Sequence, residues 1–208
     1  MTEDRTLLRL RNAEKIYRKR RVLFVDDFAL CSGDRILLSG SNGSGKSTFL
    51  RVLAGVSPLS RGEIERTERF RDMRIGVVPQ FGGLYEDLTV RENFRVICHL
   101  YGVGPEQDLG KIWFIQDMGL EPFLDMHVTQ LSGGYRKMAA LASVLLMKPE
   151  GLLLDEPTSD LDDYHTGLIY DRLEHLSEDL EFLVIAAHEA MPPDFLRRRI
   201  QMVKGGLR

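Results

Sequence analysis

Four short, almost continuous apolar runs alternate along the chain with longer stretches in which apolar residues recur at helical spacing. The runs are RILLSG (35–40), RIGVVPQ (74–80), GLLLDE (151–156) and FLVIAAH (182–188). Runs of this kind are typical of strands that are buried on both faces, as in a parallel sheet that lies between layers of helices. The pattern therefore predicts an α/β fold with a parallel sheet.

Each of these runs ends in a residue type that can take part in chemistry. The terminal residues are Gly40, Gln80, the pair Asp155–Glu156, and His188. Ligand sites of open parallel sheets lie at the carboxyl ends of the strands. We therefore expect the four run ends to surround one site.

The first thirty residues follow a different pattern. LLRLRNAEKIY (7–17) and RVLFVDDFAL (21–30) alternate between apolar and polar positions, which predicts an antiparallel hairpin at the N-terminus. Their link, RKRR (18–21), is interpreted as a solvated basic turn, and contact with a nucleotide or an acidic lipid is the alternative.

Between Leu84 and Lys148 the apolar spacing becomes helical. The predicted helices are DLTVRENFRVICHLYG (87–102, capped by Thr89), EQDLGKIWFIQDMG (106–119), and YRKMAALASVLLMK (135–148, closed by Pro149). We expect Trp113 to pack in the core. The pattern predicts one domain, 1–208, with an α/β core of about 1–83 and 145–208 and an inserted helical subdomain of about 84–144.

Composition narrows the class of protein. The chain has 208 residues, of which 43% are hydrophobic and 28% charged, as in ordinary globular domains. A net charge of −3 gives no electrostatic case for nucleic-acid binding. Cys31 and Cys98 lack metal-ligand spacing and are expected to be core residues in a reducing compartment. No apolar run reaches the roughly 18 residues of a membrane span, and no signal segment precedes the first strand. We therefore expect a soluble, cytoplasmic chain.

The segment GSNGSGKS (40–47) matches the pattern G-x-x-x-x-G-K-[ST] directly after a predicted strand. Its residues are Gly40, Ser41, Asn42, Gly43, Ser44, Gly45, Lys46 and Ser47, with Thr48 in the first helical turn. Glycines let backbone N–H groups turn inward and replace the water around phosphates. We expect Lys46 to reach the β- and γ-phosphates and Ser47 to hold magnesium, although a coincidental glycine-rich turn is the alternative.

The acidic pair in GLLLDEP supplies complementary chemistry. Asp155, at the end of a buried strand, is placed to bind magnesium through water. Glu156, one residue further, is the candidate to polarise the attacking water, and a plain helix-start acid is the alternative.

Six motifs in this order and spacing resemble the nucleotide-binding subunit of ABC transporters, over essentially the whole chain. They are GSNGSGKS, Gln80 after GVVP, the signature-like LSGGY (131–135), GLLLDE, the D-loop-like SDLD (159–162), and His188 after FLVIAA. Tyr17, upstream of Lys46, is similar to the family's adenine-stacking aromatic residue, although hairpin packing alone would also explain it. The resemblance implies a P-loop NTPase (RecA-like) core, an N-terminal antiparallel β region and the inserted helical subdomain.

The resemblance also implies a head-to-tail dimer of two copies around two ATP molecules. Ser132, Gly133 and Gly134 of each copy would face the γ-phosphate of ATP on the other, where bare glycines and a helix start favour a close anion. Gln80 would join magnesium or the lytic water, His188 would contact the γ-phosphate, and Asp160 would communicate across the interface.

Two residues depart from the family pattern. Tyr135 stands where the signature usually has glutamine, and Ser143 stands where the family usually has arginine. Either change could slow turnover. Because Lys46, Asp155 and Glu156 are retained, we still expect an active, magnesium-dependent ATP hydrolase.

The resemblance implies that a separate membrane-spanning subunit carries the substrate path. Phe81, Leu84 and Tyr85 could form its docking surface or simply cap the local core. The chain ends soon after the last predicted strand, so we expect no regulatory tail. The favoured role is the ATPase of an exporter at the cytoplasmic face of the inner membrane. The alternatives are a soluble ABC ATPase of a cytosolic assembly machine and a non-catalytic ATP-gated module, the latter motivated by Tyr135 and Ser143.

Overall fold

The structure is a computed structural model that describes residues 5–103, 109, 112–159, 161–188 and 193–208. Its strands form one sheet in the order β4-β1-β2-β9-β8-β3-β7-β6-β5. The strands are β1 (Thr6–Tyr17), β2 (Arg20–Cys31), β3 (Asp34–Ser39), β4 (Arg61–Arg66), β5 (Ile75–Val78), β6 (Gly151–Asp155), β7 (Phe182–Ala187), β8 (Arg198–Val203) and β9 (Gly206–Leu207).

The helices are spread between and after these strands. They are α1 (Lys46–Leu53), α2 (Glu68–Asp72), α3 (Val90–Leu100), α4 (Trp113–Asp117), α5 (Gly133–Leu146) and α6 (Asp163–Ser177), with the short 3₁₀ turns η3 (Glu121–Phe123) and η4 (Val128–Gln130). Across the described residues, no helix combines the length and the apolar character needed to cross a membrane.

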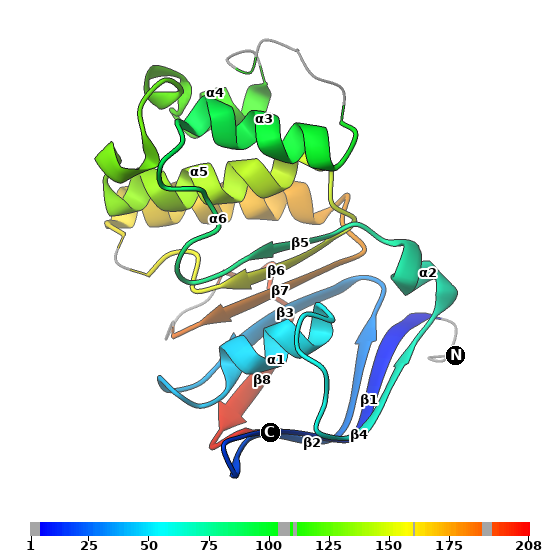
Figure 1. Ribbon diagram of the computed structural model, residues 1–208. Helices are drawn as coiled ribbons and strands as arrows, with labels where there is room; N and C mark the ends of the chain where they lie inside the picture. The colour runs from blue at the N-terminus through cyan, green and yellow to red at the C-terminus, as the bar shows by residue number, and fades with distance from the viewer. Residues whose placement is uncertain (1–4, 104–108, 110–111, 160, 189–192) are drawn as a thin grey trace.

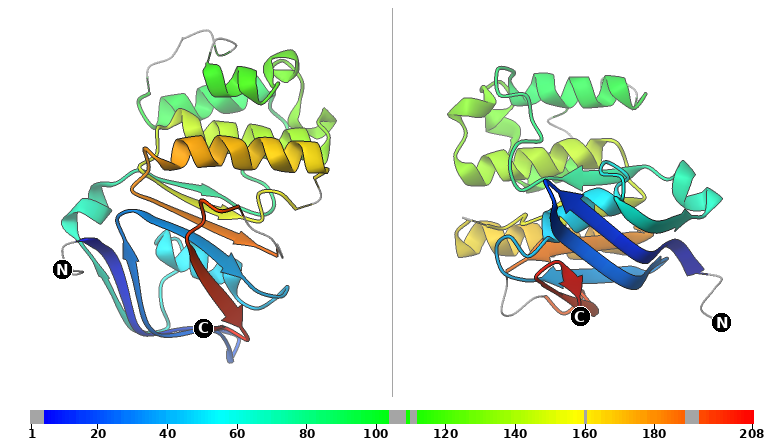
Figure 2. Two further views of the ribbon diagram at one scale, coloured as in Figure 1. Left: turned by 180° about the vertical axis from the view of Figure 1, so that it is seen from behind. Right: turned by 60° about the horizontal axis from the view of Figure 1, so that its bottom comes forward.

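The predicted parallel sheet is present as β8, β3, β7, β6 and β5, which pair in parallel in that order. Figure 1 and Figure 2 show α3, α4, α5 and α6 together over one face of β5, β6 and β7, with α1 on the opposite face. Leu152 and Leu154 pack into the cluster under the four helices, while Leu153 packs into the cluster around α1. Because both faces are buried, the strand sequence is apolar without alternation.

The second cluster also explains the alternating pattern of the N-terminal strands. Leu8 and Leu10 of β1 and Leu23 of β2 face α1, which therefore lies between the parallel strands and the antiparallel β1, β2 and β4. Arg9, Arg11 and Asp27 lie on the outer face of these strands, whereas Lys15 of β1 is buried and donates to the Pro58 carbonyl. The predicted antiparallel hairpin is confirmed, and it encloses the helix that follows the glycine-rich loop.

The turn of this hairpin is shorter than predicted. Only Arg18 and Lys19 form it, with φ angles of 46° and 67°, and Arg20 already pairs with Tyr17 in the β1–β2 ladder. Two consecutive positive φ angles suit a two-residue turn, since they match the twist of the flanking strands. Half of the basic stretch therefore belongs to β2.

The first and last predicted helices of residues 84–148 are present as α3 and α5, whereas the middle one differs from the prediction. Thr89 caps α3 in a reciprocal capping box with Glu92, as its position before the apolar spacing indicated. The predicted helix at 106–119 is present only as α4, with residues 104–108, 110 and 111 outside the described residues. Trp113 is 48% exposed, so its predicted place in the core is wrong.

Candidate active site

Four neighbouring strands of the sheet end at the same edge. Because β3, β7, β6 and β5 run in parallel, their carboxyl ends meet, with Ser39 opposite Ala187 and Asp155 opposite Ala186. The residues that follow are the predicted ones, namely Gly40, His188, Glu156 and, two residues after β5, Gln80. The four run ends thus lie together at one edge of the sheet, and their role as one site stays a prediction.

The glycine-rich loop between β3 and α1 has no room for side chains at two of its glycines. Gly40 and Gly45 have φ angles of 154° and 113°. A Cβ atom on Gly40 would lie 2.5 Å from the Met202 carbonyl oxygen, and one on Gly45 would lie 2.7 Å from the Val22 carbonyl oxygen. The loop therefore needs glycine both for its backbone angles and for its close fit against β2 and β8.

The C-terminal strands brace this loop, which the sequence did not indicate. In the turn between β8 and β9, the Gly205 N–H donates to the Ser44 carbonyl at 2.8 Å. Phe24 N–H donates to the Gly205 carbonyl at 2.6 Å, so the same turn also reaches β2. Segments from both ends of the chain thus fix the shape of the glycine-rich loop.

Lys46 begins α1 and is only 5% exposed. Its ammonium donates to the Gly40 carbonyl at 2.8 Å, lies 3.0 Å from His188 Nε2 and lies 3.3 Å from Glu156 Oε1. The Lys46 ammonium is thus buried and held by the Gly40 carbonyl, His188 and Glu156. Such a cation is suited to bind an anion at the same edge of the sheet.

Glu156 lies immediately after β6 and is 8% exposed. Its Oε2 accepts a hydrogen bond from Gln80 Nε2 at 2.8 Å, and its Oε1 lies 3.3 Å from both Lys46 Nζ and His188 Nε2. Its own φ is 51°, an unusual value for a residue with a side chain. The structure brings Gln80, Lys46, Glu156 and His188 together, and such a carboxylate can accept a proton from water.

His188 makes all of its site contacts through one ring nitrogen. Nε2 lies 2.5 Å from Asn42 Oδ1, in addition to its contacts with Lys46 and Glu156. That nitrogen donates when it carries a proton and accepts when it does not. With a proton, Nε2 can donate to Asn42 Oδ1 and Glu156 Oε1, and without one it can accept from Lys46 Nζ.

Asp155 lies in surroundings different from those of its neighbour. Burial raises the pKa of its carboxyl group, a hydrogen bond from the Ser47 hydroxyl opposes this shift, and the charge of Glu156 adds to it. Its Oδ1 atom is buried and has no hydrogen-bond partner. An unpartnered carboxylate oxygen beside a hydroxyl fits a magnesium ion, which takes few protein ligands and completes its shell with phosphates and water.

The protein alone offers few metal ligands at this edge. Within the described part of the chain, no group of three or more His, Cys, Asp or Glu side chains gathers around a point. Ser47 and Asp155 are hydrogen-bonded to each other, Gln80 contacts Glu156, and the assignment of these three residues to magnesium stays a prediction.

The signature-like residues lie at the start of α5. Ser132 caps the helix, and its Oγ accepts from the Tyr135 N–H at 3.3 Å. Ser132 and Gly133 are exposed, and a Cβ on Gly133 would meet nothing within 4 Å. In the described residues, no hydrogen bond links Ser132, Gly133 or Gly134 to the glycine-rich loop of the same chain.

Tyr17 lies at the end of β1, beside the turn of the hairpin. Its ring is partly exposed, its hydroxyl lies 3.1 Å from Ser57 Oγ, and Lys15 Nζ lies 5.0 Å from the ring centroid. The Val22 carbonyl next to Gly45 places this end of β2 against the glycine-rich loop. The role of Tyr17 as the residue that stacks on adenine stays a prediction. The predicted interface residue Asp160 lies outside the described residues.

Both departures from the family pattern have local explanations. The Tyr135 ring lies 4.1 Å from the Phe123 ring and 5.5 Å from the His165 ring, measured between centroids. Ser143 is buried, and its hydroxyl donates to the Ala140 carbonyl one turn earlier at 2.7 Å. Neither residue contacts the glycine-rich loop or Glu156 among the interactions of the described residues.

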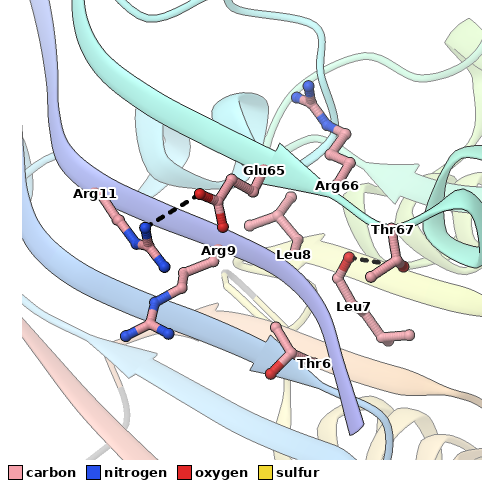
Figure 3. A pocket seen from close by; sticks show the side chains of 8 residues that line it. All are labelled: Thr6, Leu7, Leu8, Arg9, Arg11, Glu65, Arg66 and Thr67. Carbon is pink, nitrogen blue, oxygen red and sulfur yellow. Dashed lines mark hydrogen bonds and ion pairs between the residues drawn. The ribbon is translucent and has the colours of Figure 1, made fainter. Parts of the chain in front are cut away.

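Hollows lie on both sides of Glu156. One of about 290 Å³ is lined by residues that include Gln80, Lys137 and Glu156, and one of about 130 Å³ is lined by Glu156, Ser159 and His188 among others. A further hollow, of about 260 Å³, lies over β1 and β4 (Figure 3). There the Arg11–Glu65 ion pair of 3.2 Å and the hydrogen bond from Thr67 Oγ1 to the Leu7 carbonyl tie the two strands together.

The fold and the glycine-rich loop define a P-loop NTPase. The family model described as ABC transporter matches residues 23–159. The Nod factor export ATP-binding protein I of Sinorhizobium fredii is 34% identical over 207 residues, covering 96% of this chain and 60% of that protein. The Sulfoquinovosyl glycerol transport ATP-binding protein of Agrobacterium fabrum is 32% identical, covering 95% of this chain and 57% of that protein. The chain thus spans about 60% of the length of these relatives.

A solved structure agrees with this match. The ATP-binding cassette MJ0796, in a dimeric post-hydrolysis state bound to ADP and Pi, superposes with a TM-score of 0.83 at 25% identity, over 97% of this chain and 96% of that one. The chain belongs to the ABC transporter family and has the fold of an ATP-binding cassette.

Proposed function

We propose that this chain is an ATP-hydrolysing subunit that powers transport of a substrate through a separate membrane-spanning partner. The observation that carries the proposal is the buried set around Glu156, in which Gln80, Lys46 and His188 all approach one carboxylate at the edge of the glycine-rich loop. The similarity to Nod factor export ATP-binding proteins favours export as the direction.

In this proposal the loop of residues 40–48 binds the phosphates of ATP, and Lys46 neutralises their charge. Ser47, Asp155 and Gln80 would hold magnesium, which would supply positive charge to offset the negative charge of the phosphates. The buried, unpartnered Oδ1 of Asp155 supports this assignment.

The remaining residues act on water and on the nucleotide. Glu156 polarises the attacking water and accepts its proton, a role that its contacts with Gln80 and Lys46 support. His188 contacts the γ-phosphate through Nε2, which already approaches Lys46 Nζ. Tyr17 stacks on adenine at the mouth of the loop.

A second copy of the chain completes each site. The helix start at Ser132, Gly133 and Gly134, of which Ser132 and Gly133 are exposed, is suited to an anion, and no hydrogen bond among the described residues links it to the loop of its own chain. We infer that it faces the γ-phosphate of ATP on a head-to-tail partner. Asp160, in the D-loop-like segment, would communicate between the two sites.

The surface after β5 is the proposed contact with the membrane-spanning subunit. Phe81 is 80% exposed and Tyr85 is 60% exposed, whereas Leu84 is partly buried and packs on the core. In this arrangement residues of about 84–144 act as a helical subdomain on an ATP-binding core of about 1–83 and 145–208. The chain would then lie at the cytoplasmic face of the inner membrane.

Affinity purification from native membranes tests the proposal. Tagged Glu156→Gln protein is expected to retain ATP-bound complexes, so it would be isolated in ATP and magnesium from detergent-solubilised membranes and analysed by mass spectrometry. The proposal predicts a stoichiometric partner with several membrane spans, and no such partner with Lys46→Ala protein, which lacks the phosphate-binding ammonium. Recovery only with a soluble complex would favour an ABC ATPase of a cytosolic assembly machine instead.

A further inference from the structure

Lys137 connects the signature-like helix to the backbone of Glu156. It lies in the second turn of α5, and its ammonium donates to the Glu156 carbonyl at 3.0 Å and to the Ser159 carbonyl at 2.5 Å. It also donates to the Ser159 hydroxyl. All three acceptors belong to the segment that directly follows β6. The Lys137 ammonium therefore stabilises the turn that contains Glu156 by hydrogen bonds to both of its ends.

The backbone at Glu156 is one that needs such support. A φ of 51° is unfavourable for a residue with a Cβ, because the side chain then crowds the backbone. The Glu156 N–H is held by the Ala186 carbonyl at 2.8 Å, and its carbonyl accepts from the Ser159 N–H at 3.3 Å and from the Ser159 hydroxyl at 3.2 Å. The bond from the lysine ammonium is charge-assisted and is therefore the strongest interaction at this carbonyl.

The same helix carries the residues proposed to face ATP on a second copy. Lys137 follows Gly133 by four residues, so the two are about one helical turn apart on one rigid segment. A displacement of the helix start therefore also displaces the Lys137 ammonium. Because the ammonium holds the Glu156 carbonyl, it would shift the peptide that sets the direction of the Glu156 carboxylate.

We propose that Lys137 is a positioning residue for Glu156. It fixes the strained peptide so that the carboxylate points at the lytic water, and it makes that alignment depend on where the start of α5 lies. The inference rests on the proposed roles of Glu156 and of the α5 start. Lys137 itself touches neither nucleotide nor water in this account, because it acts through the Glu156 backbone.

The surroundings of Lys137 allow variants that separate the effect of its charge from the effect of its size. The hollow of about 290 Å³ beside it gives an arginine side chain room to reach the same carbonyls. Methionine keeps the apolar stem of the lysine but removes the charge and the donors. Lys148, exposed just beyond the C-terminus of α5, offers a matched control far along the same segment.

The test compares Lys137→Met, Lys137→Arg and Lys148→Met in the full chain. Steady-state ATP hydrolysis gives kcat and KM, binding of ATP without magnesium gives the nucleotide affinity, and thermal unfolding gives Tm. We expect Lys137→Met to lower kcat by about 10- to 100-fold with little change in KM or ATP affinity, because the base is misplaced while the phosphate loop is intact. Lys137→Arg should restore most of kcat, and Lys148→Met should match the parent.

A parental kcat in Lys137→Met would overturn the proposal. So would a loss of ATP affinity and Tm in parallel with kcat, because that pattern indicates a general structural role. If Lys137→Met does not fold, Lys137→Gln replaces it, because glutamine keeps a hydrogen-bond donor without the charge. The same result is expected, a lower kcat with little change in KM. A parent that hydrolyses ATP without forming ATP-dependent dimers would contradict the proposed function instead, and the comparison of variants would still decide the role of Lys137.

Discussion

Two consecutive acids at the end of β6 differ in what surrounds their carboxyl groups. Asp155 points into a buried environment in which one oxygen has no partner, whereas Glu156 is approached by Gln80, Lys46 and His188. Asp155 is the last residue of β6, whereas Glu156 lies beyond the strand with a φ of 51°, so the backbone leaves the strand conformation between the two acids. This explains how one Asp-Glu pair can offer a metal-binding carboxylate and a proton acceptor only one residue apart.

Replacing the buried acid is expected to stabilise the nucleotide-free protein. Because burial raises the pKa of Asp155 above its usual 3.8, the folded state disfavours the ionised form. Asp155→Asn removes that charge and should raise the free energy of unfolding near pH 7.5 by about 1 kcal/mol, while it abolishes magnesium-dependent ATP hydrolysis. Urea denaturation and a turnover assay measure the two effects.

The stabilisation should depend on pH in one direction. As the pH falls through the raised pKa towards 3.8, folded Asp155 takes up its proton before the unfolded chain does, so the advantage of the variant shrinks. Asp26→Asn, at an exposed position of β2, serves as the control and should show no such trend. A variant less stable than the parent at neutral pH would contradict the account of Asp155.

At the scale of one element, α5 combines three contacts within its first two turns. Ser132 caps it, Tyr135 packs between Phe123 and His165, and Lys137 holds the turn after β6. His165 belongs to α6, so the tyrosine joins the start of α5 to a helix that follows the D-loop-like segment. The departure from the usual glutamine therefore has a packing role in this chain.

Removing that ring should affect stability more than turnover. Tyr135→Gln loses two aromatic contacts and is expected to lower the free energy of unfolding by about 1 kcal/mol, while ATP hydrolysis is retained because Ser132, Gly133 and Gly134 are unchanged. Tyr135→Phe keeps the ring and should match the parent in chemical denaturation. Loss of all hydrolysis in Tyr135→Gln with unchanged stability would instead show that the tyrosine acts in the site itself.

The elements predicted from the sequence are those whose patterns are set by local burial. β3, β5, β6 and β7 contain short apolar runs because two clusters cover their faces, and the glycine-rich loop follows from spacing alone. The sequence pattern could bring Gln80, Glu156 and His188 to one edge because each lies within two residues of the end of an apolar strand. Local sequence patterns were therefore sufficient to predict the edge of the sheet at which the candidate site lies.

The features that escaped prediction depend on contacts between distant segments. β8 and β9 brace the glycine-rich loop through Gly205, and Lys137 reaches the Glu156 carbonyl across 19 positions. Trp113 was expected in the core, but only its neighbours Phe114 and Ile115 are buried there. No periodicity in the chain encodes which of three adjacent apolar residues faces outward in so short a helix.

For the whole molecule, the site lies where two hydrophobic layers meet at one edge of the sheet. The glycine-rich loop and Lys46 come from the α1 side, and the helix that carries Ser132 and Lys137 comes from the opposite side (Figure 1). Among the described residues of one chain, no hydrogen bond joins the start of α5 to the glycine-rich loop. This division is the structural reason to expect that ATP bound to one copy recruits a second.

The measurement that tests this account most directly is the mass of Glu156→Gln protein in solution, by light scattering, in magnesium and either ATP or ADP. The account predicts a dimer in ATP and a monomer in ADP, together with ATP turnover at least about 100-fold below that of the parent. A variant that stays monomeric in saturating ATP, or that hydrolyses ATP as fast as the parent, would contradict the central role given to Glu156 and to the shared site.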